Sequence, residues 1–211
     1  DFWQLLVERR DGIGDAGDRW NLSRVYDPDP MVPGKMYSRH IGMMDRIAEF
    51  DADFFGIAPR EAEAMDPQQR ILLEVSWHAL EQAGYTMPQL KNIKGGVYIG
   101  IGMQDYSALR GLGGTPETLS PYDGTGNALS VSAGRISYVY GLRGPSMAIE
   151  TACSSSLVAV HQACQSLRMG ESDLALAGGV NLMLTPDMTI IFSQARMMAP
   201  DGHCKTFDAA A

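Results

Sequence analysis

The chain has 211 residues, of which 45% are hydrophobic and 20% charged, a composition that can bury a core and excludes general disorder. Its formal net charge of -8 comes without a cluster of Lys and Arg, so we predict no binding to nucleic acid or to an anionic membrane surface. The longest apolar stretch, from Leu174 to Leu184, is about 11 residues long and too short to span a bilayer.

The cysteines predict neither a disulfide framework nor a structural zinc site. Cys153, Cys164 and Cys204 are odd in number and form no CxxC pair. His203 beside Cys204 offers only two metal ligands, fewer than a zinc site requires, so we expect no metal. This cysteine usage favours a reducing cytoplasm.

Helical and strand-like segments alternate along the chain, a pattern typical of an α/β fold. The first well-marked helix is predicted to begin after Asp66, because Asp followed by Pro67 is a typical helix start. We expect Gly84 to end it. Its expected inward stripe comprises Ile71, Leu72, Val75, Ala79 and Ala83.

A buried strand over 96–102 and a helix over 127–140, closed by Gly141, are predicted next. The inward face expected for this helix comprises Leu129, Ala133, Ile136 and Tyr140.

A strand over 145–151 is predicted to turn directly into a helix that begins near Cys153 and ends at Gly170. The strand over 174–184 that follows is almost continuously apolar, as expected when both faces of a strand are covered. The expected inward stripe of the helix comprises Leu157, Val160, His161, Cys164 and Leu167.

Cys153 is the candidate nucleophile, because it lies at a strand-to-helix junction between small residues. The N–H groups of a first helical turn carry a partial positive charge that stabilises a thiolate. Small neighbours let a carbonyl group approach the sulfur and let backbone N–H groups reach the developing oxyanion. A buried, inert cysteine is the alternative, and for Cys164 on the same helix it is the favoured interpretation.

The segment Glu150 to Leu157 (ETACSSSL) resembles the active-site signature of β-ketoacyl synthases, whose usual form has Asp at the position of Glu150. Further segments resemble the ketosynthase domains of type I polyketide synthases and cover nearly the whole chain. They are FDADFFGIAPREAEAMDPQQRILLE at 50–74, AGRISY at 133–138, GPSM at 144–147 and ACQSLRMGESDLALAGGVNLML at 163–184.

The resemblance implies a thiolase-like fold, a layered αβαβα arrangement of two similar halves, and a homodimer. Residues 1–211 are then expected to be the N-terminal half of a ketosynthase domain, without its first strand and its C-terminal half. Members of the family use two histidines of the second half to promote decarboxylation, and neither motif occurs here. We expect His161 to be a packed helix residue and Glu150 a structural group near a turn.

The resemblance also implies the chemistry. Cys153 accepts an acyl chain from the phosphopantetheine arm of acyl carrier protein, and a malonyl-type extender is then decarboxylated to attack the cysteine-bound thioester. No cofactor is bound directly, and a neighbouring acyltransferase domain is an expected partner. Phe192 and Met103 correspond to substrate-binding residues of the acyl pocket, although ordinary core roles are an equal alternative.

Three other functions stay open. A fatty-acid 3-oxoacyl-[acyl-carrier-protein] synthase has the same fold, and a non-catalytic relative would shape only a pocket or a heterodimer. Retention of Cys153 argues against the non-catalytic relative. A cysteine hydrolase would need a base within reach of the thiol, and His161 lies about 12 Å further along the predicted helix.

Overall fold

The computed structural model describes residues 2–111, 117 and 119–209, which fall into two compact units. The smaller unit combines Asp1–Arg46 with Met183–Ala211, and the larger one is Ile47–Leu182. Within the described ranges, no helix has both the length and the apolar character needed to cross a membrane.

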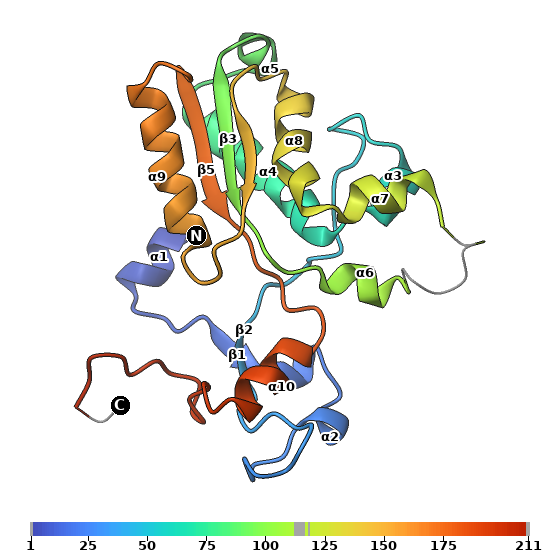
Figure 1. Cartoon of the computed structure of the whole chain (residues 1–211), viewed down its shortest axis with the longest axis vertical. Helices are drawn as coiled ribbons and strands as arrows, with labels where there is room; N and C mark the ends of the chain where they lie inside the picture. The colour runs from blue at the N-terminus through green and yellow to red at the C-terminus, as the bar shows by residue number, and fades with distance from the viewer. Residues whose placement is uncertain (1, 112–116, 118, 210–211) are drawn as a thin grey trace. The chain divides into compact units, whose positions relative to one another are not determined.

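The larger unit is built on a parallel sheet of three strands in the order β4-β3-β5 (Figure 1). Central β3 is buried along its whole length, whereas β5 is partly exposed at one edge of the described sheet. The three predicted strands are confirmed, but the expected cover on both faces of the last one is wrong. Their bounds are Gly95–Gly100 for β3, Ser146–Ile149 for β4 and Leu174–Gly179 for β5.

Two helices, α8 (Leu129–Tyr140) and α9 (Ser155–Arg168), cover opposite faces of this sheet. Alternate side chains of β3 show the two faces, because successive residues of a strand point in opposite directions. Val97 and Ile99 belong to the main core with α8, whereas Tyr98 belongs to a separate cluster with α9. The α/β layering predicted from the alternation of elements is therefore confirmed.

Helix α8 confirms both its predicted position and its predicted inward face. Ala133, Ile136 and Tyr140 are buried in the main core, and Leu129 packs against it. Gly141 ends the helix in a left-handed conformation, with φ of +70°, which favours glycine.

Helix α4 (Pro67–Gln82) begins where Asp66 predicts, since its carboxylate accepts a hydrogen bond from the Gln68 N–H at 2.8 Å. Gly84 follows the helix with φ of +85°. The predicted stripe is confirmed at Leu72 but wrong at Val75, which is 53% exposed, because the inward face is displaced around the helix. The buried residues include Gln68, Gln69, Leu72, Leu73, Ser76 and Leu80.

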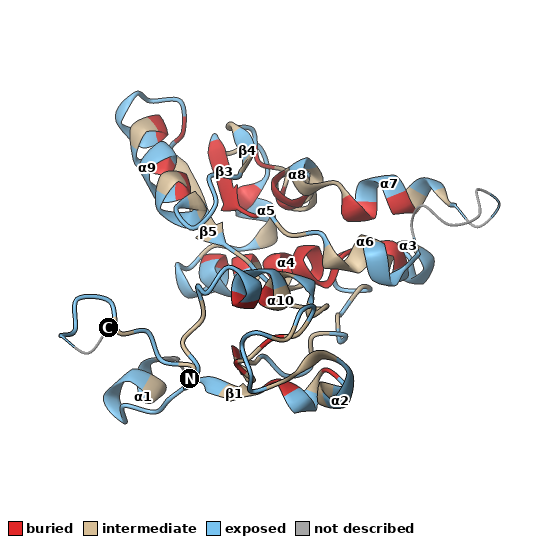
Figure 2. Ribbon diagram, turned by 60° about the horizontal axis from the view of Figure 1, so that its bottom comes forward, coloured by how far each residue is buried: buried red, intermediate tan, exposed pale blue. Residues whose placement is uncertain are grey.

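The predicted stripe of α9 is also wrong. Leu157 is 74% exposed, and His161 and Cys164 are exposed as well, so neither has the packed role expected of it. Figure 2 shows the outward side of α9 in the colour of exposed residues. Small side chains face the sheet instead, because the helix lies close to it. They are Ala159, Ala163 and Ser166.

The hydroxyl group of Tyr140 joins α8 to α4. It donates to the Leu73 carbonyl at 2.7 Å and lies 3.1 Å from the Ser76 hydroxyl. Burial raises the pKa of Tyr140 to about 12, because the phenolate would lose its solvation. Tyr140 therefore stays protonated at pH values where an unfolded tyrosine ionises.

Tyr140→Phe is expected to lower the free energy of unfolding by about 1 kcal/mol, because it removes a buried hydrogen bond. In the unaltered domain, stability is expected to fall as pH rises above 10, the ordinary pKa of tyrosine. The unfolded state loses the phenolic proton there and the folded state keeps it. Urea unfolding of the complete parent domain from about pH 8 to about pH 11 tests this. An equally steep loss of stability in the variant would contradict it.

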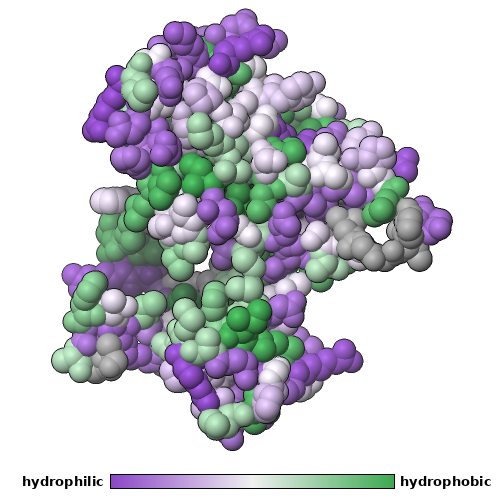
Figure 3. All heavy atoms as spheres, viewed as in Figure 1, coloured by the Kyte–Doolittle hydropathy of each residue, from purple (hydrophilic) through white to green (hydrophobic). Residues whose placement is uncertain are grey.

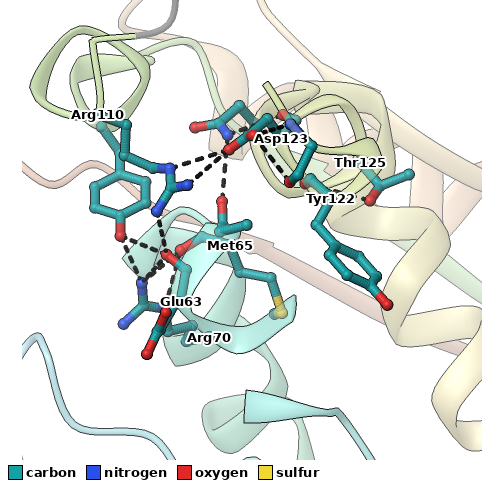
Figure 4. Close-up of polar contacts among 11 residues, drawn as sticks. Glu63, Met65, Arg70, Arg110, Tyr122, Asp123 and Thr125 are labelled. Carbon is teal, nitrogen blue, oxygen red and sulfur yellow. Dashed lines mark hydrogen bonds and ion pairs between the residues drawn. The ribbon is translucent and has the colours of Figure 1, made fainter. Parts of the chain in front are cut away.

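Short helices complete the described part of the larger unit, and polar side chains connect several of them. Arg110 pairs with Asp123 at 2.9 Å, and its guanidinium points toward that carboxylate in Figure 4. The Ser120 N–H, and then Arg110, lower the pKa of Asp123. Arg70 of α4 donates to the Met65 carbonyl at 2.7 Å. The helices are α3 (Pro59–Ala64), α5 (Met87–Leu90), α6 (Asp105–Leu109) and α7 (Pro121–Asn127).

The smaller unit contains an antiparallel pair of strands, β1 with β2, and its own core of Ala16, Trp20, Met36 and Ile41. The indole N–H of Trp20 donates to the Leu184 carbonyl at 3.1 Å, which connects the two chain segments that form this unit. Its elements are α1 (Phe2–Val7), β1 (Ile13–Asp15), the 3-10 helix η1 (Ala16–Asp18), α2 (Leu22–Val25), β2 (His40–Gly42) and α10 (Asp187–Gln194).

Candidate active site

Cys153 lies in the short turn between β4 and α9, and the residue is exposed. Ala152, just before it, has φ of +54°, which is uncommon for a residue with a Cβ atom. Such a conformation persists only where the surrounding structure enforces it. Cys153 is therefore not buried in the described part of the chain, and its role as a nucleophile stays a prediction.

Hydrogen bonds of neighbouring serines hold this turn. The Ser154 hydroxyl donates to the Thr151 carbonyl at 2.7 Å, and the Ser155 hydroxyl donates to the Ala152 carbonyl at 2.7 Å. The Ser155 oxygen also accepts from the Thr151 N–H at 2.9 Å. The serines of the ETACSSSL motif therefore satisfy the backbone on both sides of Cys153.

Glu150 supports the same turn from the other side. Its Oε1 accepts a hydrogen bond from the Ala152 N–H at 3.0 Å, so the expected structural role near a turn is confirmed. Its side chain packs on Gly102, where an added Cβ would lie 3.0 Å from the Glu150 Cγ. The absence of a side chain at Gly102 leaves room for glutamate where the family usually has aspartate.

Two glycines allow the first turn of α9 to approach the sheet closely. A Cβ at Gly100, the last residue of β3, would lie 2.7 Å from the Ser156 backbone nitrogen. A Cβ at Gly179, the last residue of β5, would lie 2.8 Å from the Ser156 Cβ. The turn that carries Cys153 therefore packs at the carboxyl ends of the strands, the edge where open parallel sheets bind ligands.

The two predicted pocket residues lie in different units. Met103 follows β3 in the larger unit and is half-buried. Phe192 is on α10 in the smaller unit and is 38% exposed, so it is not an ordinary core residue. Hydrophobic side chains gather at the surface over α10 (Figure 3). A pocket role for either residue stays a prediction.

The described residues include no group of three or more His, Cys, Asp and Glu side chains arranged to hold a metal ion. All three cysteines are free thiols. The histidines of the described chain are exposed or half-buried, and His161 is exposed on α9.

Residues 1–211 match the family model described as the N-terminal domain of β-ketoacyl synthase. The chain therefore belongs to the β-ketoacyl synthase family. It is 51% identical over 211 residues to a phenolphthiocerol/phthiocerol polyketide synthase protein of Mycobacterium tuberculosis, covering 100% of this chain and 14% of that protein. It is 49% identical over 213 residues to a pikromycin polyketide synthase component of Streptomyces venezuelae, covering 100% of this chain and 6% of that protein.

Solved ketosynthases have the same fold. An oxazolomycin ketosynthase domain from Streptomyces albus superimposes with a TM-score of 0.86 and 38% identity, over 98% of this chain and 36% of that one. The ketosynthase of module 6 of the Bacillus subtilis bacillaene synthase superimposes with a TM-score of 0.84 and 41% identity, over 99% of this chain and 33% of that one. These matches confirm the thiolase-like fold, of which the chain forms the N-terminal half.

The sequence interpretation missed the two glycines that let α9 approach the sheet and the two buried glutamines at the start of α4. Gly100 and Gly179 end apolar strands, a place where glycine often marks a close approach of two backbones. Gln68 and Gln69 follow a reliable helix start, and their burial was not predicted because polar side chains are usually exposed.

Proposed function

We propose that the parent protein is a polyketide synthase ketosynthase and that Cys153 carries the acyl chain during extension. The observation that supports this most directly is the exposed thiol in a turn held by Glu150, Ser154 and Ser155, within a chain of the β-ketoacyl synthase family. The relatives named above are polyketide synthases, which favours this pathway over fatty-acid synthesis.

The proposed reaction has two stages. In the first, the Cys153 thiolate attacks an acyl thioester on the phosphopantetheine arm of a carrier protein, and the pantetheine thiolate leaves and takes a proton from solvent. In the second, a malonyl-type unit loses carbon dioxide, and its carbanion attacks the Cys153 thioester carbonyl and releases the cysteine thiolate. The product is a β-ketoacyl chain two backbone carbons longer, bound to the carrier protein.

Carrier protein and acyltransferase domains are the proposed partners, and their support comes from the multidomain character of polyketide synthases. We further propose a homodimer. Strand β4 is at an edge of the described sheet, and Tyr138 of the adjoining α8 is 88% exposed. Such an edge can pair with another strand. Sedimentation of the complete parent domain tests this, and a monomer at micromolar concentration would contradict it.

We place the reaction in the cytoplasm and propose that the domain binds no cofactor directly. The support for the compartment is the presence of three free thiols with no disulfide among them. The support for the absence of a directly bound cofactor is chemical, because acyl transfer and decarboxylation use the substrate's own thioester and carboxylate.

The test of the proposed function is a condensation assay with the complete parent domain, a short acyl-pantetheine thioester and malonyl-loaded carrier protein. The expected product is the β-ketoacyl carrier protein, identified by its mass. Release of the free acid from the thioester would instead indicate a cysteine hydrolase. A folded sample with neither an acyl adduct nor a product would indicate a non-catalytic relative.

A further inference from the structure

Gln68, in the first turn of α4, is buried and makes three hydrogen bonds through its side-chain amide. The Nε2 atom donates to the Met103 carbonyl at 2.9 Å and to Asp66 Oδ2 at 3.3 Å. The Oε1 atom accepts from the Leu182 N–H at 3.2 Å. Both donor hydrogens and the acceptor are therefore engaged.

These bonds connect the segments that leave two strands of the sheet. Met103 follows β3, and Leu182 follows β5, so one side chain fixes both segments at the edge where Cys153 lies. A buried amide with every hydrogen bond satisfied favours one arrangement of its partners, because any other leaves a polar group unpaired.

A continuous set of contacts connects Gln68 to Cys153. Met103 adjoins Gly102, and Gly102 lies against the Glu150 side chain. Glu150 in turn accepts the hydrogen bond of the Ala152 N–H, next to the thiol. A displacement of the segment after β3 would therefore move the group that holds the cysteine turn.

We infer that Gln68 is a positioning residue for the acylation of Cys153, an inference that rests on the proposed function. Gln68 does not touch the acyl group. It holds the Met103 segment against Glu150, so that the Ala152–Cys153 turn keeps the geometry in which the thiol meets a thioester carbonyl.

The test compares the rate of Cys153 acylation in the complete parent domain and in Gln68→Glu. At about pH 8 the new carboxylate cannot donate to the Met103 carbonyl, and it lies beside Asp66. We expect acylation by a short acyl-pantetheine thioester to slow by about tenfold to a hundredfold, the range for a misplaced reacting group. The rate is measured by intact mass.

The pH dependence of Gln68→Glu separates positioning from a general loss of structure. Burial already raises the pKa of Asp66. A second carboxylate beside it disfavours the state in which both groups are charged, so the pair binds one proton at a higher pH than a single carboxyl group would. Arg70 and Asp105 are the other charged groups acting on Asp66. As pH falls from about 8 to about 5.5, the protonated glutamate regains a donor, so the rate relative to the unaltered domain should rise.

Gln69→Glu is the matched control. Gln69 is also buried in the first turn of α4, but its Nε2 donates to the Gly126 carbonyl at 2.9 Å and its Oε1 accepts from Arg135 at 3.0 Å. Gln69 therefore contacts the C-terminal end of α7 and Arg135 of α8, and not the strand ends. We expect acylation within about twofold of the unaltered domain even where the thermal midpoint falls.

Gln68→Met is the second test variant, since it keeps the side-chain length and removes every hydrogen bond without adding charge. Its acylation rate should fall by the same factor as in Gln68→Glu at about pH 8, and the rate should not recover at low pH. The positioning role would be overturned by unaltered acylation rates in both Gln68 variants or by equal slowing in Gln69→Glu. It would also be overturned if both Gln68 variants failed to fold. Absence of acylation in the unaltered domain would instead contradict the proposed function.

Discussion

Replacing Cys153 with alanine is expected to remove the acyl adduct of the parent domain, a loss of more than about a thousandfold in acylation rate. The reason is chemical, because alanine has no sulfur to carry the acyl group in the turn held by Glu150 and two serine hydroxyls. The measurement is intact mass and peptide mapping after exposure to a short acyl-pantetheine thioester. In the unaltered domain the acyl group should map to the Cys153 peptide alone.

Cys164→Ala provides the control for this result. Cys164 is also an exposed free thiol on α9, but it lies in the middle of the helix, where no comparable turn surrounds it. Its replacement should leave acylation unchanged. An adduct on Cys164 or Cys204 in the folded domain would argue for nonspecific thiol chemistry and against the proposed nucleophile.

The second large effect is expected from Gly100→Ala, which should lower the free energy of unfolding by about 1–3 kcal/mol, the usual cost of overpacking. The new Cβ would lie 2.7 Å from the Ser156 nitrogen and 2.8 Å from the Ser155 carbonyl carbon. Both are backbone atoms of α9 and cannot move aside as a flexible side chain would. Displacement of α9 should also slow the acylation of Cys153.

Gly178→Ala is the matched control for Gly100→Ala. Gly178 lies in β5 of the same sheet, and an added Cβ there would meet nothing within 4 Å. We expect a change in unfolding free energy below about 0.5 kcal/mol, typical of a substitution without a new contact. Urea unfolding of the two variants measures the difference. Equal destabilisation would show that the loss comes from glycine itself and not from the close approach of α9.

Local signals were sufficient to locate most elements. Asp66 and Pro67 marked the start of α4, Gly141 and Gly170 marked helix ends, and the small residues around Cys153 marked the turn into α9. Each signal depends on the backbone conformation of one or two residues, so it can be recognised without knowledge of the tertiary structure. The resemblance to ketosynthases then supplied the fold.

The inward faces of α4 and α9 were not predicted, because apolar periodicity assumes that the larger apolar side chains face the core. In α9 the first turn lies close to Gly100 and Gly179, and the buried residues of the helix are the small Ala159, Ala163 and Ser166. In α4 the buried face includes Gln68, whose partners follow β3 and β5 far along the chain. Such partners become visible only when the strands are placed side by side.

The serine hydroxyls beside Cys153 also bear on the lifetime of a thioester. An oxygen ester is more stable than a thioester, so a free hydroxyl next to the acylated sulfur would draw the acyl group away irreversibly. Ser154 and Ser155 direct their protons to the carbonyl oxygens of Thr151 and Ala152, at 2.7 Å in each case. These hydroxyl groups are thereby held on the backbone, and for the proposed reaction we expect the acyl chain to stay on sulfur in its activated form.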